Sequence, residues 1–271
     1  MTDHYAVIGN PIAHSKSPAI HAAFARQTGE DIVYEAILAP LDGFAATVAA
    51  FRAAGGRGMN VTLPFKLEAL ALAEKPTERA RLAGAANTLR FDADGVFADN
   101  TDGVGLVRDV RDRLGLPLDG RRVLILGAGG AARGVILPLL DEKPALLAIA
   151  NRSVDKAEAL AARFAPFGKL DAGGFEDFAG GCFDVVINAT SAGLAGQKLP
   201  LPEGVFAPGA LAYDMVYGPQ ETPFMAQARR LGAARVADGL GMLVEQAAES
   251  FFLWRGVRPN TAPVLAMLAG G

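Results

Sequence analysis

The sequence predicts an α/β protein with two units: an N-terminal α/β unit and a Rossmann-type unit with a doubly wound parallel sheet. Short apolar runs alternate with amphipathic segments, which is typical of βαβ organisation. This alternation restarts after residue 102, and the later part carries a glycine-rich turn between an apolar run and a helical segment. We therefore expect domains at 1–102 and 103–238, with C-terminal helices in 239–271 returning to the first domain.

The elements expected in the first domain follow from hydrophobic periodicity and turn residues. Asp94-Gly95 is a strong turn signal between two apolar runs, so we expect a hairpin of 86–92 and 95–100. Gly29 marks the end of the first helical segment. The remaining expected elements are strands at 5–9, 32–38 and 58–64 and helices at 18–29, 44–56 and 66–73.

The same signals organise the rest of the chain. Residues 121–140 predict a strand, a tight turn and a helix, and Pro138 is expected to kink this helix because proline removes a backbone hydrogen bond. Segments 241–256 and 262–270 are helical and apolar on more than one side, so we expect them to pack against the first domain. The remaining expected elements are helices at 103–115, 154–164 and 222–232, a loop at 116–120 and strands at 145–151, 183–190 and 211–217.

Composition excludes several classes of protein. The 271 residues are 51% hydrophobic and 20% charged, which is enough apolar material for packed cores and argues against disorder. The net charge of −3 and the absence of a basic block argue against nucleic-acid binding. No apolar run is long enough for a membrane span, and the start of the chain lacks the pattern of a signal peptide. A lone Cys182 with three histidines is a poor metal-binding set, so we expect a cytoplasmic protein without a metal.

The stretch "GNPIAHSKSPAIH" (9–21) allows two interpretations. In the first, Ser17 is the N-cap of the following helix and Pro18 its first residue, where the missing N–H costs nothing. Ser15 and Lys16 are then ordinary loop residues. In the second, the serine hydroxyls bind a ligand.

The stretch "ILGAGGAAR" (125–133) carries the fingerprint Gly127-x-Gly129-x-x-Ala132 between an apolar strand and a helix. In dinucleotide-binding folds such glycines allow the tight turn and let the backbone approach a pyrophosphate at the helix N-terminus. The alternative is a glycine-rich turn needed only for packing.

The residues after the next strand indicate which dinucleotide binds. An NAD site carries an acidic residue there, about 20 residues after the glycines, whereas this chain has Asn151-Arg152-Ser153 and then Lys156. A guanidinium can clamp a 2′-phosphate, so Arg152 favours NADP over NAD. Asp155 falls after the strand and is interpreted as a capping or surface residue, and a solvated loop position remains the alternative for Arg152.

A redox site of this kind needs a group that exchanges a proton with the substrate oxygen. Lys66 begins a helix after "NVTLP", a poor place for a cation in the field of the helix. Asp102 lies in "DNTDG" (99–103), where the two domains meet and where we expect the mouth of an interdomain cleft. A surface lysine and a helix-capping aspartate are the alternatives, and none of the three histidines is favoured as the proton-exchanging group.

Nine stretches together resemble the shikimate dehydrogenases, NADP-dependent enzymes of aromatic amino-acid biosynthesis. The resemblance spans the whole chain and is carried, in order, by "GNPIAHSKSPAIH", "NVTLPFK", "AGAANTL", "DNTDG", "GAGGAAR", "NRS", "NATSAG", "DMVY" and "DGLGMLVEQ". It implies that the first domain binds the substrate and the second binds NADP. The implied reaction is the reversible reduction of 3-dehydroshikimate to shikimate by NADPH.

The resemblance also implies roles for individual residues on the substrate side. Lys66 and Asp102 would be the catalytic pair, in which the carboxylate holds the lysine that exchanges the proton. The substrate carboxylate would be bound by Ser15 and Ser17, assisted by Thr62 and Tyr217. The ring hydroxyls would be lined by Lys66, Asn87, Asp102 and Gln246.

On the cofactor side, the resemblance implies that "NATSAG" (188–193), including Thr190, runs beneath the nicotinamide half. Two departures from the family pattern are "NRS" where "NRT" is usual and Lys156 where arginine is frequent, which loses bidentate geometry. The implied cofactor-binding residues are Gly127, Ala128, Gly129, Gly130, Ala131, Asn151, Arg152, Ser153, Lys156, Thr190, Met215, Gly239, Met242 and Glu78.

Two alternatives to this function remain open at the level of sequence. One is a relative that also accepts quinate or NAD, and the other is a non-catalytic NADP-binding regulatory protein. The presence of both Lys66 and Asp102 argues against the second. The sequence does not decide between a monomer and a homodimer.

Overall fold

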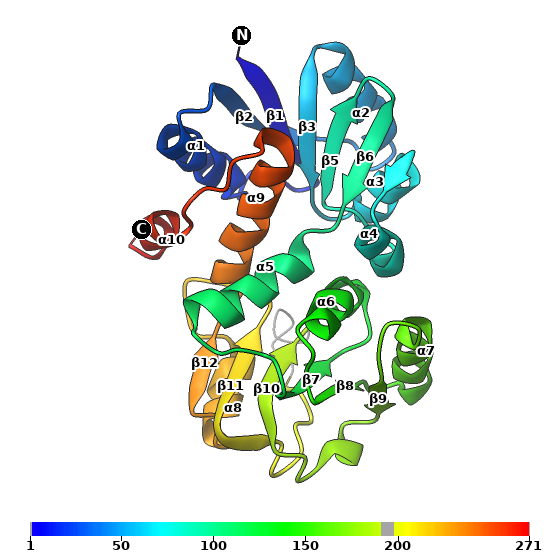
Figure 1. The fold of residues 1–271 in the computed structure, drawn as a ribbon, viewed down its shortest axis with the longest axis vertical. Coiled ribbons are helices and arrows are strands. Elements are labelled where there is room, and N and C mark those ends of the chain that lie inside the picture. The colour runs from blue at the N-terminus through cyan, green and yellow to red at the C-terminus, as the bar shows by residue number, and fades with distance from the viewer. Residues whose placement is uncertain (1, 191–197, 271) are drawn as a thin grey trace. The chain divides into compact units, whose positions relative to one another are not determined.

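The computed structural model describes residues 2–190 and 198–270 (Figure 1). The chain forms two compact units, Met1–Gly105 with Leu243–Gly271, and Leu106–Met242. The first unit thus takes up the C-terminal segment as well as the N-terminal part. Its limits fall a few residues from the domain boundaries expected at 102 and 238.

The first unit is built on a six-stranded mixed sheet in the order β2-β1-β3-β5-β6-β4. β1 pairs in parallel with β2 and β3, whereas β5 runs antiparallel to both β3 and β6. The hairpin of β5 and β6 forms around Asp94-Gly95 as expected. The strands are β1 (Asp3–Gly9), β2 (Ile32–Leu38), β3 (Gly56–Val61), β4 (Lys75–Pro76), β5 (Thr88–Asp92) and β6 (Gly95–Asp99).

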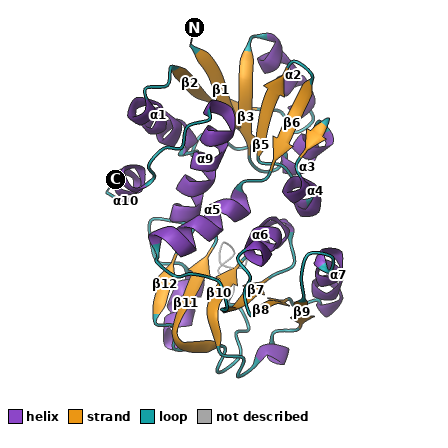
Figure 2. Ribbon diagram, in the orientation of Figure 1, coloured by secondary structure: helices purple, strands orange, loops and turns teal. Residues whose placement is uncertain are grey.

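Two separate apolar clusters stabilise the first unit. One joins the central strands to the helices that follow β2 and β3, and Phe44 stacks on Phe65 within it. The other joins the first helix to the two C-terminal helices through Phe24, Phe251 and Val264. Figures 1 and 2 show the C-terminal helices on this unit. The helices are α1 (Ser17–Thr28), α2 (Phe44–Ala53), α3 (Lys66–Ala71), α4 (Glu78–Ala83), α9 (Leu240–Arg255) and α10 (Ala262–Ala269).

The second unit carries a six-stranded, wholly parallel sheet in the order β12-β11-β10-β7-β8-β9. Counted along the chain, this is the doubly wound 3-2-1-4-5-6 order, which reverses direction between β7 and β10. The α/β class with a Rossmann-type second domain is therefore confirmed. The chain passes from the first unit to the second within α5 (Asp102–Arg108). The other elements are β7 (Arg122–Leu126), α6 (Gly130–Asp141), β8 (Leu146–Ala150), α7 (Val154–Phe164), β9 (Leu170–Gly173), β10 (Phe183–Asn188), β11 (Phe206–Asp214), α8 (Pro223–Arg230) and β12 (Arg235–Ala237).

Three details of the elements differ from the expectations. The helix expected at 103–115 changes to a π-helix over Asp109–Arg113, in which Asp109 is fully buried and accepts hydrogen bonds from Arg113 and Tyr213. The strand expected at 211–217 ends at Asp214, because the Asp214 carboxylate accepts a hydrogen bond from Val216 N and turns the chain. The short strands β4, β9 and β12 were not expected.

Two further features concern the helices. Pro138 lies inside α6, as expected, and is buried. None of the helices in the described part of the chain is long and apolar enough to cross a membrane.

His21 is enclosed between α1, β2 and α9. Its ring stacks on that of Tyr34 with centroids 4.1 Å apart, and it lies 5.4 Å from the Trp254 ring. Complete burial lowers the pKa of His21 from its usual 6.5 to about 3. The folded first unit therefore holds this imidazole in its neutral form.

The buried imidazole makes the stability of the first unit dependent on pH. Below pH 6.5 the unfolded chain binds a proton at His21 that the folded chain excludes, so stability falls as the solution becomes more acidic. We expect His21 to account for about 2 kcal/mol of lost stability between pH 7 and pH 5. His21→Phe, which preserves the ring stack, should lack this part of the loss. Urea unfolding at pH 7 and pH 5, followed by the fluorescence of Trp254, the sole tryptophan, measures the free energy of unfolding. The same pH dependence in His21→Phe as in the unmodified chain would contradict the role given to His21.

Candidate active site

Lys66 and Asp102 form an ion pair in the first unit. Lys66 is the first residue of α3 and Asp102 the first residue of α5. The Lys66 Nζ lies 2.6 Å from Asp102 Oδ2, and the two side chains are 27% and 21% exposed. The pair is thus held together while the ammonium group remains open to a small molecule. The structure brings the two residues into contact although 35 residues separate them in the chain.

The side-chain amide of Asn87 fixes the other oxygen of Asp102. The backbone N–H of Thr101 donates to Asn87 Oδ1 at 2.9 Å, which orients the amide so that its NH₂ group faces Asp102. Asn87 Nδ2 then donates to Asp102 Oδ1 at 2.8 Å and to Gln246 Oε1 at 3.2 Å. The predicted residues Lys66, Asn87, Asp102 and Gln246 therefore form one connected group.

Asp102 does not cap α5 with its side chain, because Asn100 performs that task. Asn100 Oδ1 accepts a hydrogen bond from Asp102 N at 3.2 Å, and Asn100 Nδ2 donates to Ala85 O. The Asp102 carboxylate is consequently available to Lys66 and Asn87. The capping interpretation of Asp102 was wrong for this reason.

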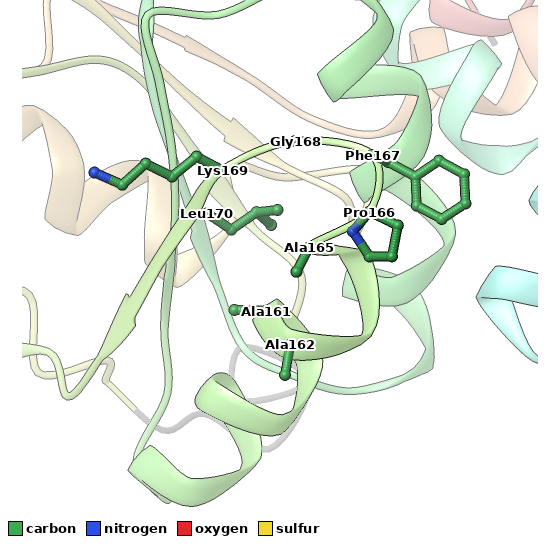
Figure 3. Close-up of a pocket in the computed structure, with 8 residues that line it drawn as sticks. All are labelled: Ala161, Ala162, Ala165, Pro166, Phe167, Gly168, Lys169 and Leu170. Carbon is green, nitrogen blue, oxygen red and sulfur yellow. The ribbon is translucent and has the colours of Figure 1, made fainter.

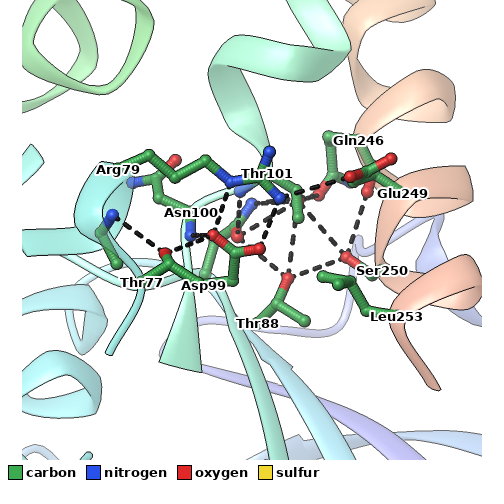
Figure 4. A network of polar contacts seen from close by, with 12 residues as sticks. Thr77, Arg79, Thr88, Asp99, Asn100, Thr101, Gln246, Glu249, Ser250 and Leu253 are labelled. Carbon is green, nitrogen blue, oxygen red and sulfur yellow. Dashed lines mark hydrogen bonds and ion pairs between the residues drawn. The ribbon is translucent and has the colours of Figure 1, made fainter. Parts of the chain in front are cut away.

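A buried ion cluster supports the loop that carries Asn100 and Asp102 (Figure 4). Asp99, only 1% exposed, accepts from Asn100 N at 2.7 Å and from Arg79 Nε at 2.6 Å. A second nitrogen of Arg79 reaches the other Asp99 oxygen and also Glu249 on α9, and Glu249 pairs with Arg258 at 2.8 Å. The two guanidinium groups and the two carboxylates of the cluster give no net charge. Sequence analysis missed this cluster because its members lie on four separate segments.

The opening loop differs from the capping expectation. Lys16 already has helical backbone angles and occupies the N-cap position, so Ser17 is the first helical residue and not the cap. Ser15 Oγ instead accepts from Ser17 N at 3.3 Å. Ser15 is half-buried and Ser17 is 8% exposed.

Buried polar groups connect Tyr34 to Asn87. Burial raises the pKa of the Tyr34 hydroxyl well above its usual value of 10, and the Ser17 side chain acts in the opposite direction. Tyr34 donates to Asn60 Oδ1 at 2.8 Å, and Asn60 Nδ2 donates to the backbone oxygen of Asn87 at 3.2 Å. Sequence analysis gave Tyr34 no role. The signal that could have indicated these hydrogen bonds was Asn60, a polar residue at the end of a buried strand.

Thr62 lies close to the end of β1. A Cβ added to Gly9 would come within 2.5 Å of Thr62 Cγ2, so only glycine leaves room for this threonine beside the opening loop. The predicted carboxylate-binding residues Ser15, Ser17 and Thr62 thus follow the adjacent, parallel strands β1 and β3.

The glycine-rich turn in the second unit joins β7 to α6 where the strand order reverses. Gly127 has φ +104°, and a Cβ there would meet Thr190 Cγ2 at 2.8 Å. Within the described residues, Gly129 faces open space and no side chain caps α6, so the first N–H groups of the helix can receive an anion. Gly129, Gly130 and Ala131 are exposed and Ala128 is half-buried. This turn fits the phosphates of a dinucleotide.

The residues after β8 form an unpaired basic edge. Arg152 and Lys156 are exposed, and no hydrogen bond or ion pair engages either side chain in the described part of the chain. Asn151 Nδ2 donates to Ser153 O at 2.9 Å, and Ser153 is half-buried at the start of α7. Asp155 lies exposed in the first turn of α7. The edge therefore retains two free cations for a phosphate.

The expected nicotinamide-side residues of the second unit lie after β10, β11 and β12. Thr190 N donates to Asn188 Oδ1 at 3.0 Å, whereas residues 191–193 of "NATSAG" lie outside the described residues. Met215 follows β11, and a Cβ on Gly239 would lie 2.3 Å from Met215 O, so the two backbones touch. Met242 is 8% exposed in α9.

Among the described residues, no hydrogen bond joins Glu78 or Tyr217 to another predicted site residue. Glu78 is exposed in the first turn of α4, in the first unit. Tyr217 is 37% exposed after β11, in the second unit, and burial of its hydroxyl with the nearby Asp238 raises its pKa. Their predicted contacts with cofactor and substrate stay predictions.

A pocket in the second unit lies elsewhere, where α7 ends and β9 begins (Figure 3). Small and apolar side chains line most of it, with Lys169 as its cation. It contains none of the predicted site residues. We therefore do not consider it part of the candidate site.

Comparison with known proteins agrees with this geometry. The model of the shikimate dehydrogenase substrate binding domain matches residues 7–89, that of shikimate / quinate 5-dehydrogenase matches 110–195, and that of the shikimate 5′-dehydrogenase C-terminal domain matches 239–268. The shikimate dehydrogenase (NADP(+)) of Dechloromonas aromatica is 66% identical over 99% of this chain and 98% of that protein. The chain belongs to the shikimate dehydrogenase family.

Solved structures extend the family likeness to the fold. An Ael1 enzyme from Pseudomonas putida is 52% identical, with a TM-score of 0.94 over 98% of both chains. A shikimate 5-dehydrogenase from Thermus thermophilus in complex with NADP(H) and shikimate is 35% identical, with a TM-score of 0.86 over 99% of this chain and 100% of that one. The resemblance stated from the sequence motifs is confirmed.

The ion cluster around Asp99 should matter for stability. Arg79→Met leaves the buried Asp99 without its guanidinium, so we expect the free energy of unfolding of the first unit to fall by about 3 kcal/mol. Arg57→Met is a matched control, because Arg57 is 58% exposed and its partner Asp3 also pairs with Arg255. The free energy of unfolding should fall by less than about 1 kcal/mol in Arg57→Met. Urea unfolding followed by Trp254 fluorescence compares the two, and equal losses would contradict the importance of burial.

Proposed function

We propose that this chain catalyses the reversible reduction of 3-dehydroshikimate to shikimate with NADPH. The observation that carries the proposal is the Lys66–Asp102 pair, with a nitrogen–oxygen distance of 2.6 Å and both side chains partly exposed. Asn87 holds this pair in place by donating a hydrogen bond to Asp102 Oδ1. Asn87 lies in the part of the chain that matches the family's substrate binding domain. NADPH supplies the hydride of the reduction.

Lys66 handles the proton of the reaction. During reduction its ammonium group donates a proton to the oxygen of the substrate ketone as that oxygen gains negative charge. During oxidation the neutral amine takes the proton from the hydroxyl. Asp102 accepts a hydrogen bond from Lys66 on one oxygen and from Asn87 on the other, so the carboxylate keeps Lys66 Nζ in one position throughout.

The remaining first-unit residues bind and orient the substrate. Ser15, Ser17 and Thr62 offer hydroxyl groups to its carboxylate, with Tyr217 as a further donor. A site of hydroxyls binds this group through geometry, with little contribution from charge. Asn87 and Gln246, which already contact each other, line the ring hydroxyls beside Lys66 and Asp102.

The second unit holds the cofactor. The backbone N–H groups of the Gly127–Ala131 turn receive the diphosphate, and Arg152 and Lys156, with Asn151 and Ser153, receive the 2′-phosphate. Thr190, Met215, Gly239 and Met242 surround the nicotinamide, and Glu78 approaches it. Two observations on the part of the chain that the structure describes support this assignment: no side chain caps α6, and neither Arg152 nor Lys156 has a partner.

We further propose that the chain acts in the cytoplasm as a monomer or a homodimer. Its only cysteine, Cys182, is a free and exposed thiol. Such a thiol is typical of proteins from a reducing compartment.

Steady-state oxidation tests the proposed reaction. The purified protein is assayed with shikimate and with quinate, each with NADP⁺ and with NAD⁺, by absorbance of the reduced nicotinamide. We expect the highest kcat/KM for shikimate with NADP⁺. Comparable rates with quinate or NAD⁺ would indicate the broader specificity. A folded protein without activity in any pairing would contradict an enzymatic function and favour a regulatory NADP-binding role.

Removing the proposed proton donor should slow turnover strongly while shikimate still binds. We expect Lys66→Ala to lower kcat for shikimate oxidation by about 10² to 10⁴ fold, because general acid–base catalysis contributes about that factor. Lys169→Ala, at an exposed lysine outside the candidate site, is the control and should leave kcat unchanged. Calorimetric titration with shikimate checks binding. An unaltered kcat in Lys66→Ala would exclude the proposed role.

Arg152 should decide the choice of cofactor. We expect Arg152→Ala to raise KM for NADP⁺ at least about tenfold, because a charge-assisted bond to the 2′-phosphate is lost. KM for NAD⁺, which has no such phosphate, should stay within about twofold. The same Lys169→Ala variant serves as the control. A similar rise for both cofactors would show that Arg152 does not recognise the 2′-phosphate.

A further inference from the structure

Arg133 lies beside the phosphate-binding turn. It is part of α6, three residues after Gly130, and its buried Nε has no hydrogen-bond partner among the described residues. No ion pair engages its guanidinium in residues 2–190 and 198–270. A buried N–H group without an acceptor costs free energy, so this arrangement needs an explanation.

The guanidinium lies toward the N-terminal end of α6. Side chains on a helix point back toward its N-terminus, and a Cβ added to Gly130 would lie 3.8 Å from Arg133 Nη2. Gly129, one residue earlier, faces open space. The positive end of the helix dipole repels a cation at this place. An anion bound at the turn would reverse that penalty and would give the terminal nitrogens of the Arg133 guanidinium an acceptor.

We propose that Arg133 binds the bridging diphosphate of the cofactor. The inference rests on the proposed use of NADP. The guanidinium would donate charge-assisted hydrogen bonds to diphosphate oxygens that the backbone N–H groups of the turn already orient. Arg133 thereby differs from Arg152 and Lys156, which act on the 2′-phosphate. Arg133 acts on the part of the molecule that NADP⁺ and NAD⁺ share.

A role in diphosphate binding and a role in packing alone predict different effects of replacing Arg133. A methionine retains much of the length and apolar volume of the arginine stem but has no charge and no donor. If Arg133 served packing alone, Arg133→Met would leave cofactor affinity unchanged. If it binds the diphosphate, the variant loses affinity for both dinucleotides while its unliganded fold is preserved.

Equilibrium binding to the intact protein tests this. Calorimetry or equilibrium dialysis gives Kd for NADP⁺ and for NAD⁺ with the unmodified chain, Arg133→Met and Arg152→Met. We expect Arg133→Met to raise both Kd values by a similar factor of about ten or more, since a hydrogen bond to a charged group is lost. Arg152→Met should raise the Kd of NADP⁺ far more than that of NAD⁺.

A second readout separates binding from folding. Without cofactor, Arg133→Met should unfold at the same temperature as the unmodified chain or higher, and saturating NADP⁺ should raise its Tm less. Unchanged Kd values, or a loss confined to NADP⁺, would overturn the assignment to the diphosphate. Lower thermal stability without cofactor together with unchanged Kd values would also overturn it. If the unmodified chain binds neither dinucleotide, the proposed cofactor use fails, independently of any effect of Arg133.

Discussion

The orientation of one buried amide, that of Asn87, sets the geometry of the candidate active site. The backbone N–H of Thr101 occupies the amide oxygen, so the amide nitrogen faces Asp102. With one of its oxygens held by Asn87, the Asp102 carboxylate presents the other to Lys66. A flipped amide would place two oxygens against each other. The position of the proposed proton donor thus depends on the hydrogen bonds that Thr101 and Thr88 donate to the Asn87 amide oxygen.

The two units use different physical means to prepare for charged ligands. In the first, a neutral cluster of Arg79, Asp99, Glu249 and Arg258 holds the loop beneath Asp102, so its buried charges are satisfied within the protein. In the second, no side chain caps the start of α6, and Arg133 Nε has no hydrogen-bond partner within residues 2–190 and 198–270. We propose that an anion, the cofactor diphosphate, binds the start of α6 and the Arg133 guanidinium.

The sequence predicted the features that depend on local pattern. The glycine fingerprint at Gly127, the Asp94-Gly95 hairpin and most strands follow from turn chemistry and periodicity, which neighbouring residues determine. The pairing of Lys66 with Asp102 came only from family resemblance. The capping of α1 was wrong because Lys16 already has helical angles, and the Asp99 cluster was missed because long-range packing unites charges that look solvated in sequence. Two-residue strands such as β4 leave no periodicity to detect.

Lys66 and Asp102 should act as one unit in the reaction. A double-mutant cycle on kcat for shikimate oxidation, with Lys66→Met, Asp102→Asn and the double variant, tests it most directly. Groups that act together show strongly non-additive losses. We expect the double variant to be about as slow as the slower single variant. Losses that multiply would contradict the account, because the carboxylate and the ammonium group would then contribute independently.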